Sequence, residues 1–339
     1  MNVVLIIPTG LGAEIGGHAG DATPVAKLIG KCCNTLITHP NVVNASDHNE
    51  MPDNTLYVEG SILDRFLRGE IRLNPVKTYN RILLIVNRPV TNETINAVST
   101  ARMTLGADIK ILELKEPLIM KAFFKGGRAT GHVSGIDSLI DQVNGYYDCF
   151  DAIALSTSID VDNKETALEY LRGVGGINPW GGVEAKVSKR IADATDKPVA
   201  HAPFGHTIDE NFNEVVDPRM AAEMVSCTYL QCVLKGLHRA PRISKNVGLS
   251  VNDVDLLISP VCSVGEPHWA CEKAGIPIIV VNENRAVGYE EMYEKLSSNE
   301  GNYIVVENYL EAAGLIMAMK AGVYWRILFR PVKQTERCI

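Results

Sequence analysis

The sequence predicts an α/β protein with mostly parallel β-sheets, and two observations support this prediction. Short, continuous apolar runs such as residues 81–86 alternate with stretches of helical length along the 339 residues, and such runs are typical of strands covered on both faces. Polar or glycine residues follow several of these runs directly. We therefore expect two Rossmann-like lobes, residues 1–135 and 136–339, with a cleft at the carboxyl ends of the strands.

The composition is that of an ordinary globular protein, with 46% apolar and 22% charged residues. The formal net charge of −7 argues against nucleic acid as a partner, because nucleic-acid binding needs a basic face. No apolar run reaches the roughly 18 residues that span a bilayer, and the first apolar run lacks the basic residues of a signal peptide. The eight cysteines contain no C-x-x-C pair, which suits a reduced protein. We expect a cytoplasmic protein without a membrane partner.

Ten strands are expected, and all are short runs of mainly apolar residues. They are residues 3–7, 34–38, 56–58, 81–86, 109–114, 151–156, 197–200, 255–259, 276–281 and 303–306. The run at 81–86 (RILLIV) has the composition of a strand buried on both faces. Helical segments stand between most of these runs, and this order favours parallel pairing with right-handed crossovers.

The expected helices are recognised by their length, their apolar face and the residues at their ends. They are residues 22–32, 91–105, 164–172, 183–195, 266–274 and 309–321, a helix that begins at Ser61, and a helix or helix pair at 217–236. Asp217 followed by Pro218 is a strong helix start, and Gly275 is a typical helix end. The apolar residues 312–319 also suggest a homo-oligomer, although they can instead pack on the sheet.

A basic, glycine-rich segment at residues 125–131 (KGGRATG) interrupts this regular pattern. One interpretation is a surface hairpin or a domain boundary, because most such segments are connections. The other is a lid that carries Lys125 and Arg128 to an anion.

The first strand runs into a loop that is unusually rich in glycine. Its glycines are Gly10, Gly12, Gly16, Gly17 and Gly20. Glycine lets the backbone approach a ligand, and the following helix offers N–H groups and a partial positive charge. The loop does not match a dinucleotide fingerprint, because Ile15 and Glu14 occupy positions that need glycine, and it has no P-loop lysine. We therefore predict a carboxylate or phosphate site, with a purely structural turn as the alternative, and no nucleotide cofactor.

Two histidines stand in matched positions, each at the end of an expected strand and close to a proline. They are His39 and His201. Histidine readily serves as acid, base or metal ligand near neutral pH, so we predict that both transfer protons while Asp21 or Glu59 orients them or the substrate. Asp21 can equally be the N-cap of the first helix, and strand-end histidines can be purely structural.

Further candidate residues lie near the same strand ends. We expect Asn41, Asn44 and Glu184 to bind substrate, although Glu184 also suits a helix start. His206 together with His39 or Glu59 offers a divalent-metal site, but their spacing is not diagnostic, and no metal is assigned. Cys232 reads as a buried core thiol and Cys262 as a loop thiol.

Several long segments resemble a family of bacterial and plant proteins catalogued as a domain of unknown function, number 3326. These segments are TGLGAEIGGHAGDATPVA, LITHPNVVNA, LYVEGSILDRF, GGVEA, HAPF and AAEMVSCTYLQCVLKGLHRAP. The resemblance covers nearly the full length and implies a shared pocket, without naming a reaction. The residues that fall in its motifs are Gly10, Gly12, Gly16, Gly17, Gly20, Asp21, His39, Asn41, Asn44, Glu59, Gly60, Asp64, Glu184, His201 and Cys232. His18 and His206 depart from the pattern, which weakens a metal site built on them.

These observations lead to three functional hypotheses. The first is an enzyme that acts on a small anionic metabolite by proton transfer, of the lyase, isomerase or hydrolase type. Hydride transfer fits less well, because no dinucleotide fingerprint is present. The second is a metabolite-binding or regulatory protein without turnover. The third is a hydrolase that depends on a divalent metal.

Overall fold

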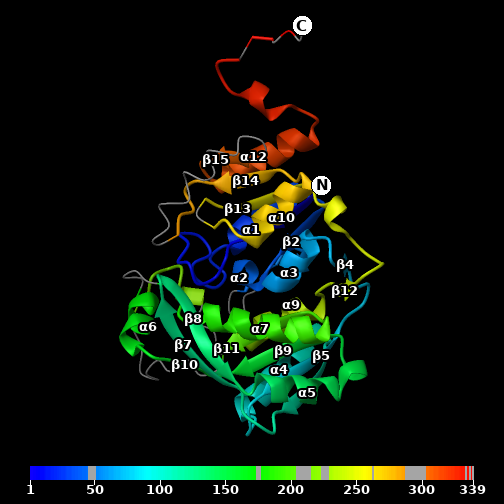
Figure 1. The fold of residues 1–339 in the computed structure, drawn as a ribbon, viewed down its shortest axis with the longest axis vertical. Coiled ribbons are helices and arrows are strands. Elements are labelled where there is room, and N and C mark those ends of the chain that lie inside the picture. The colour runs from blue at the N-terminus through cyan, green and yellow to red at the C-terminus, as the bar shows by residue number, and fades with distance from the viewer. Residues whose placement is uncertain are drawn as a thin grey trace.

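A computed structural model describes residues 1–44, 51–172, 177–203, 215–222, 229–261, 263–286, 303–332, 334–335 and 337. Within these residues the largest sheet has six strands in the order β15-β14-β13-β1-β2-β3, all parallel (Figure 1). Its strands are β1 (Asn2–Leu5), β2 (Thr35–Thr38), β3 (Thr55–Tyr57), β13 (Leu256–Pro260), β14 (Ile278–Val281) and β15 (Tyr303–Val306). This sheet joins the first part of the chain to the last.

A second sheet has four described strands in the order β11-β9-β5-β6, which are also parallel. Its strands are β5 (Arg81–Val86), β6 (Asp108–Glu113), β9 (Ala152–Thr157) and β11 (Val199–Pro203). Together the two sheets confirm the prediction of an α/β protein with mostly parallel sheets. The strands β5 and β9 are almost completely buried, as their continuous apolar sequences require.

The glycine-rich segment at 125–131 is the turn and second arm of a hairpin. Strand β7 (Ile119–Lys125) pairs antiparallel with β8 (Arg128–Ser134), and β10 (Ile159–Val161) pairs parallel with β7. Gly126 and Gly127 form the two-residue turn, with φ of +59° and +72°, a backbone that glycine adopts without strain. The hairpin interpretation is therefore confirmed. A short antiparallel pair joins β4 (Arg72–Asn74) to β12 (Arg242–Ser244).

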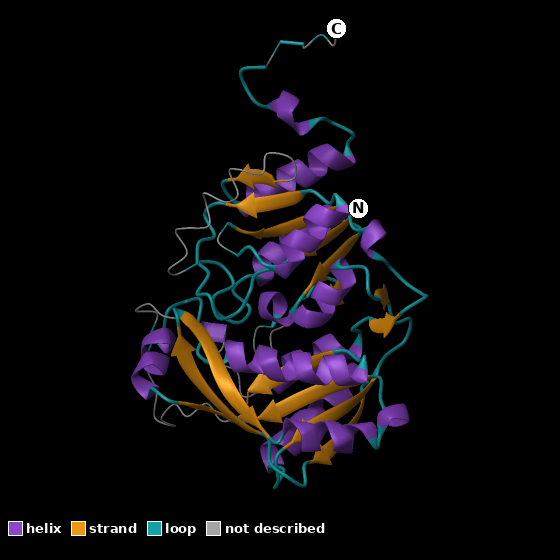
Figure 2. Cartoon of the chain, viewed as in Figure 1, coloured by secondary structure: helices purple, strands orange, loops and turns teal. Residues whose placement is uncertain are grey.

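Helices cover both faces of each parallel sheet (Figure 2). Helices α1 (Thr23–Cys32) and α12 (Tyr309–Lys320) pack on one face of the six-stranded sheet, and α3 (Gly60–Leu67) and α10 (Glu266–Ala274) pack on the other. On the four-stranded sheet, one face carries α5 (Ile136–Asn144) and α7 (Gly181–Thr195), and the other carries α4 (Asn92–Leu105) and α9 (Leu230–His238). Shorter elements are α2 (Pro40–Val43), α6 (Lys164–Leu171), and the 3₁₀ turns Tyr147–Cys149, Val251–Asp253 and Trp325–Leu328.

The two sheets share one continuous packing arrangement. Helix α3 packs against α7, and Arg65 at the end of α3 forms an ion pair with Asp196 just beyond α7, at 2.7 Å. On the opposite side, α9 lies so close to β3 that a Cβ at Gly236 would overlap the ring of Tyr57. These two contacts fasten elements of the six-stranded sheet to elements of the four-stranded sheet.

The sheets do not follow the predicted division at residue 135. The six-stranded sheet contains β1 to β3 from the first part of the chain and β13 to β15 from the last, whereas residues 81–203 build the four-stranded sheet. The chain therefore leaves the first sheet and returns to it. The sequence pattern is the same in both sheets, so it carries no signal of which strands pair.

The sequence did not predict five of the described α-helices and strands, namely α2, α5, β4, β10 and β12, and all of them except α5 are only three or four residues long. Near Asp217 the structure has a turn in which the Asp217 carboxylate accepts the Arg219 N–H at 2.9 Å, as a cap would. Residues His206, Glu223, Cys227 and Cys262 lie outside the described residues. Within the described part of the chain, no helix combines the length and the apolar character needed to cross a membrane.

Candidate functional site

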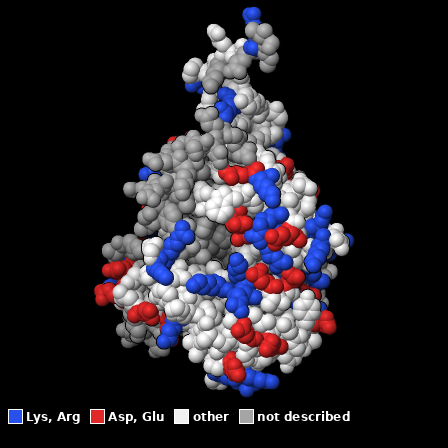
Figure 3. Space-filling view, in the orientation of Figure 1, with Lys and Arg blue, Asp and Glu red and all other residues white. Residues whose placement is uncertain are grey.

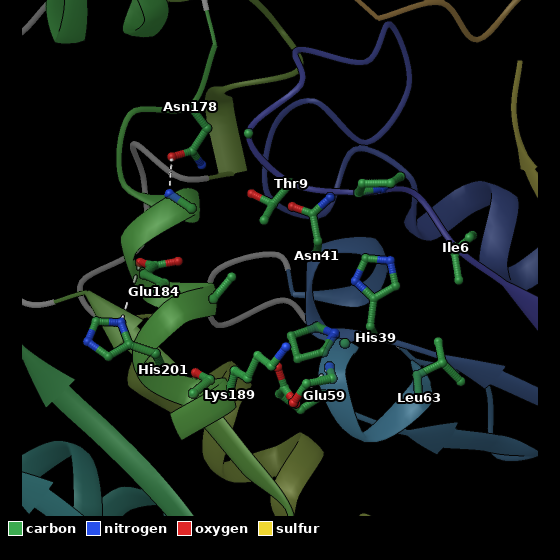
Figure 4. Close-up of a pocket in the computed structure, with 18 of the residues that line it drawn as sticks. Ile6, Thr9, His39, Asn41, Glu59, Leu63, Asn178, Glu184, Lys189 and His201 are labelled. Carbon is green, nitrogen blue, oxygen red and sulfur yellow. Dashed lines mark hydrogen bonds and ion pairs between the residues drawn. The ribbon is translucent and has the colours of Figure 1, made fainter. Parts of the chain in front are cut away.

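A cavity of about 550 Å³ lies where the carboxyl ends of strands from both parallel sheets meet. The six-stranded sheet supplies residues that follow β1, β2, β3 and β13, and the four-stranded sheet supplies β11. Helices α3, α7 and α10 begin at its wall. The predicted residues that line it are Gly10, His39, Asn41, Asn44, Glu59, Glu184 and His201 (Figure 4). His39 directly follows β2 and His201 lies within β11, so strands of two different sheets bring the two histidines to one cavity.

The start of α7 approaches the cavity through two consecutive glycines. A Cβ at Gly181 would overlap the hydroxyl of Thr9, and one at Gly182 would overlap the carbonyl oxygen of Ala129. The side chain of Asn178 caps this end, because its Oδ1 accepts the N–H groups of Trp180 and Gly181 at 2.9 and 3.1 Å. Only glycine permits this contact between α7, the loop after β1 and the hairpin.

Glu184, three residues further along α7, faces His201. Glu184 Oε1 lies 3.4 Å from His201 Nδ1, and the other ring nitrogen, Nε2, lies 2.9 Å from Thr157 Oγ1 (Figure 4). The side chain of His201 is 2% exposed and that of Glu184 is 23% exposed. Glu184 is therefore the more accessible member of the pair. Glu184 Oε1 and His201 Nδ1 face each other without a hydrogen bond, and both atoms are buried with no other hydrogen-bond partner among the described residues. We predicted that Asp21 or Glu59 orients the histidines or the substrate, and the carboxylate beside the ring of His201 is Glu184.

His39 lies on the wall of the cavity opposite His201, and one of its ring nitrogens already accepts a hydrogen bond from the protein. The backbone N–H of Ile7 donates to His39 Nε2 at 3.0 Å, and burial lowers the pKa of His39 to about 4. A ring nitrogen that accepts a hydrogen bond carries no proton, so the neutral ring carries its proton on Nδ1. At neutral pH His39 is therefore suited to donate a hydrogen bond rather than to accept a proton.

Glu59 lines the cavity but is engaged with the start of α3. Its Oε2 accepts the N–H groups of Ser61 and Ile62 at 2.9 and 3.1 Å, as well as the hydroxyl of Ser61. Burial raises the pKa of Glu59. Asp64, one turn further along α3, also lines the cavity, and burial together with the negative charge of Glu59 raises its pKa to about 7.

Asn41 and Asn44 differ in what they leave available to a ligand. Asn41 Nδ2 donates to the carbonyl oxygens of Ile7 and Gly16, at 2.7 and 2.9 Å, so it ties the loop after β1 to the cavity wall. Asn44 Oδ1 accepts the hydroxyl of Tyr57 at 3.0 Å. Both side chains therefore have structural bonds, while the amide nitrogen of Asn44 remains a donor.

The glycine-rich loop is placed differently from the prediction. Of its predicted binding residues, only Gly10 is among those that line the cavity. Gly12, Gly16, Gly17, Gly20 and Asp21 are not. A Cβ at Gly16 would overlap the buried side chain of Ile7, and one at Gly17 would overlap the carbonyl oxygen of Ala13. These two glycines allow the loop to pack on itself and on β1.

Asp21 belongs to this packing. Its Oδ1 accepts the N–H of Gly16, and its Oδ2 is buried without a hydrogen-bond partner among the described residues. Burial raises the pKa of Asp21 to about 7. The loop is fastened from the last part of the chain by Asn284, whose side chain bonds both the N–H and the carbonyl oxygen of Ile15 at 2.9 Å. Asp21 therefore closes a loop turn, beside rather than within the cavity.

Two basic side chains that were not grouped from the sequence line the cavity. Lys189, on the same helix as Glu184, and Arg128, at the start of β8, both line it. Arg128 lies on the hairpin, which was one of the two interpretations of this segment, the other being a lid. Figure 3 shows acidic and basic side chains intermixed over the face that carries α3 and α7. The spacing of Glu184, Ser188 and Lys189 on one helical face was the signal that could have indicated this wall.

Metal and thiol chemistry find little support in the described part of the chain. No group of three or more His, Cys, Asp or Glu side chains there is arranged to hold a metal ion, and His206 lies outside it. Cys232 is 1% exposed within the core, as expected for a structural thiol.

The chain belongs to the family described as "Protein of unknown function (DUF3326)", whose sequence profile matches residues 2–329. It is also similar to a protein of Synechococcus sp. named "Uncharacterized lipoprotein", with 34% identity over 94% of this chain and 91% of the relative. No solved structure matches the chain significantly.

Proposed function

We propose that this protein is an enzyme that acts on a small anionic metabolite by proton transfer, of the lyase, isomerase or hydrolase type. The observation that carries the proposal is the Glu184–His201 pair, which stands in a cavity where the carboxyl ends of two parallel sheets meet. Open α/β sheets bind ligands at this edge. A carboxylate beside a buried histidine is suited to acid–base work.

The anion would be held by helix ends and cations together. Helices α3 and α7 both begin at the cavity, and the Arg65–Asp196 ion pair joins their far ends, so their positive ends point the same way. A helix start favours negative charge. Arg128 and Lys189 add full positive charges, and the Nδ1–H of His39 adds a donor. Glu59 and Asp64 restrict where the anion can bind, because it is better placed toward α7 than toward these two carboxyl groups.

The proton would move at Glu184. In its ionised form the Glu184 carboxylate takes a proton from a carbon or oxygen of the substrate, or from a water molecule that attacks the substrate. The resulting carboxyl group later returns this proton to the product. The Nδ1–H of His201 would donate to Oε1, while its Nε2 accepts the hydroxyl of Thr157. The 3.4 Å separation of Glu184 and His201 is of a kind that tightens when a substrate binds. His201 is then a positioning residue, and Glu184 is the catalytic residue.

We further propose that the two parallel sheets with their helices act as two Rossmann-like lobes, with the cavity as the cleft between them. The Gly181–Thr9 approach would be the contact through which the lobes meet. Small movements there would change the size of the cavity and exclude water from Glu184.

The proposal includes a cytoplasmic location without a membrane or nucleic-acid partner. The similar protein is named a lipoprotein, and that name is the observation that points away from this location. The described cysteines are free thiols, which suits a reducing compartment.

The test is a screen of small carboxylates and phosphates by thermal shift, followed by ¹H NMR of each hit with enzyme. Wild-type protein should form a product or exchange a substrate proton, and Glu184→Gln should bind the hit without reacting. The matched control is Glu169→Gln on α6, since Glu169 is exposed and does not line the cavity. A hit that binds to wild-type protein without forming a product or exchanging a proton would refute the proposal of an enzyme.

A second candidate function is a metabolite-binding or regulatory protein without turnover. It is favoured by the fact that each histidine already has a ring nitrogen bonded to the protein, to Ile7 for His39 and to Thr157 for His201. Imidazole rings fixed in this way can bind a ligand and need not transfer protons. This function predicts that wild type and Glu184→Gln both release their ligand unchanged, and that substitution of His39 weakens its retention.

A further inference from the structure

Helix α12 lacks the polar face of an ordinary surface helix. Ala312 and Ile316 are fully buried against the body, yet the opposite side carries Leu310 and Met317, which are 72% and 50% exposed. Gly314 lies between them and is also exposed.

Glu311 and Lys320 are the charged residues of α12 that are exposed, so the exposed side is apolar between its first and last turns. Exposed apolar strips of this kind often mark an interaction site. We call Leu310, Gly314 and Met317 the outer face of α12.

The chain continues from α12 into an arm, residues 323–332, that projects from the rest of the molecule (Figure 1). The arm exposes large apolar side chains along its length. They are Tyr324, Ile327, Leu328, Phe329 and Val332. Within the arm, Trp325 packs edge-to-face on Phe329, with ring centroids 5.8 Å apart, so its turn has a defined shape. Soluble proteins rarely expose so many neighbouring apolar side chains unless they bind something.

Charge distinguishes the arm from its surroundings. It contains Arg326 and Arg330 and no acidic residue, whereas the whole chain has a net charge of −7. Figure 3 shows basic side chains along this projection. The charged residues exposed at the other end of α12 are acidic, namely Glu307 and Glu311. One carboxylate oxygen of each already accepts a hydrogen bond within the chain, from the Asn282 side chain and from the Glu307 N–H. The helix therefore carries negative charge beside its first turn and positive charge beyond its last.

We propose that the arm and the outer face of α12 bind a second copy of this chain. In a two-fold contact the same surface faces itself, so two α12 helices would lie antiparallel. The outer faces would cover each other, and Arg326 and Arg330 of one copy would reach Glu307 and Glu311 of the other. An anionic lipid surface would cover the arm but would repel these carboxylates, so the charges favour the second copy. This inference does not depend on the proposed function.

The experiment is size-exclusion chromatography with light scattering on the full chain at tens of micromolar. Wild-type protein should have twice the 37.0 kDa mass of one chain. The double variant Leu310→Lys/Met317→Lys should be monomeric. The matched control is Met103→Lys, which changes a methionine of α4 that is 85% exposed and so more exposed than Met317, and it should remain dimeric.

Substitutions that reverse single charges provide a second test in case the Leu310→Lys/Met317→Lys variant does not fold. Glu307→Arg and Arg326→Glu should each weaken the dimer, and a chain with both changes should recover it, because the ion pair is restored with reversed sign. A monomeric wild type would overturn the proposal. So would retained dimers in all variants, or a wild-type monomer that sediments with phosphatidylglycerol vesicles through its arm.

Discussion

The glycine loop after β1 and the start of α7 are both rich in glycine, but they use it for different purposes. In the loop, Gly16 and Gly17 make room for Ile7 and for the carbonyl oxygen of Ala13, so the segment packs on itself. At α7, Gly181 makes room for Thr9, so a helix start reaches a strand end of the other sheet. A glycine cluster therefore signals close approach, and only the tertiary structure decides whether a cavity results.

The carboxylates of the two regions differ in the same way. Asp21 is held by the N–H of Gly16 and does not line the cavity. Glu184 lines the cavity and lies beside a buried histidine. Position near a helix start is shared by both and does not identify the functional one. Access to the cavity does.

The largest expected effect separates these two carboxylates. Replacing Glu184 with Gln should lower turnover of the identified substrate by about 100-fold or more, because the proton acceptor is lost. Replacing Asp21 with Asn should leave turnover within about threefold, since an amide oxygen can still accept the N–H of Gly16. Steady-state kinetics of both variants measure this contrast. Equal losses would place the two regions in one site and contradict the account.

The next effect concerns stability. Gly16→Ala should lower the free energy of unfolding by about 2–4 kcal/mol, because the new Cβ meets Ile7 and the φ of +85° disfavours alanine. The control is Gly126→Ala, where φ is +59° but no atom lies near the new Cβ. It should cost only about 1 kcal/mol. Urea titration compares the two, and equal costs would show that loop packing is unimportant.

A smaller effect should appear in ligand affinity. Gly181→Ala places a methyl group against Thr9, so it should push α7 away from the cavity and weaken ligand binding about tenfold, which is 1.4 kcal/mol. Adding Thr9→Ala should recover part of that loss by making room. Isothermal titration of the single and double variants measures the coupling. Additive losses would mean that the approach of α7 to Thr9 does not shape the site.

The remaining prediction is a pH dependence of stability that comes from Asp64. Its pKa is raised to about 7 in the folded protein from 3.8, so the folded state binds its proton more tightly. Stability contributed by this group is therefore lost as pH rises from about 4 to 7, and the penalty is complete above 7. Each pKa unit corresponds to about 1.4 kcal/mol, so Asp64→Asn should raise the free energy of unfolding by at most about 4 kcal/mol at pH 8 and have little effect near pH 4.

The control for this pH effect is Asp141→Asn on α5. Asp141 is exposed, so its replacement should change stability little at either pH. Thermal unfolding of both variants at pH 4 and pH 8 provides the comparison. An Asp64→Asn variant that is stabilised equally at both pH values would show that proton binding is not the cause.

Local features of the fold were predictable from the sequence, and long-range partnerships were not. The run RILLIV became β5 with the expected bounds, because a continuous apolar run determines a buried strand locally. The pairing of β1 with β13, 251 residues apart at its closest in sequence, leaves no local trace and decides which strands share a sheet. Partner choice depends on packing of the whole chain.

The same limit applies to the candidate site. His39 and His201 both line one cavity, but they come from different sheets, since His39 follows β2 and His201 lies in β11. The edges of the two parallel sheets meet at this cavity, and nothing in the sequence indicates that meeting. The partner of His201 was not foreseen, since Glu184 belongs to a helix and Thr157 to a neighbouring strand. Nor could the sequence indicate that Ile7 would occupy a nitrogen of His39. A hydrogen bond between a backbone group and a side chain that is distant in the sequence depends on the tertiary structure.

The most direct test of the central claim is proton exchange at the bound metabolite. Each hit of the thermal-shift screen is incubated in D₂O with wild type, Glu184→Gln or Glu169→Gln, and its ¹H NMR spectrum is followed. The account predicts product or deuterium uptake with wild type and Glu169→Gln, and an unchanged spectrum with Glu184→Gln despite retained binding. Binding without exchange or product in wild type, or full activity of Glu184→Gln, would contradict it.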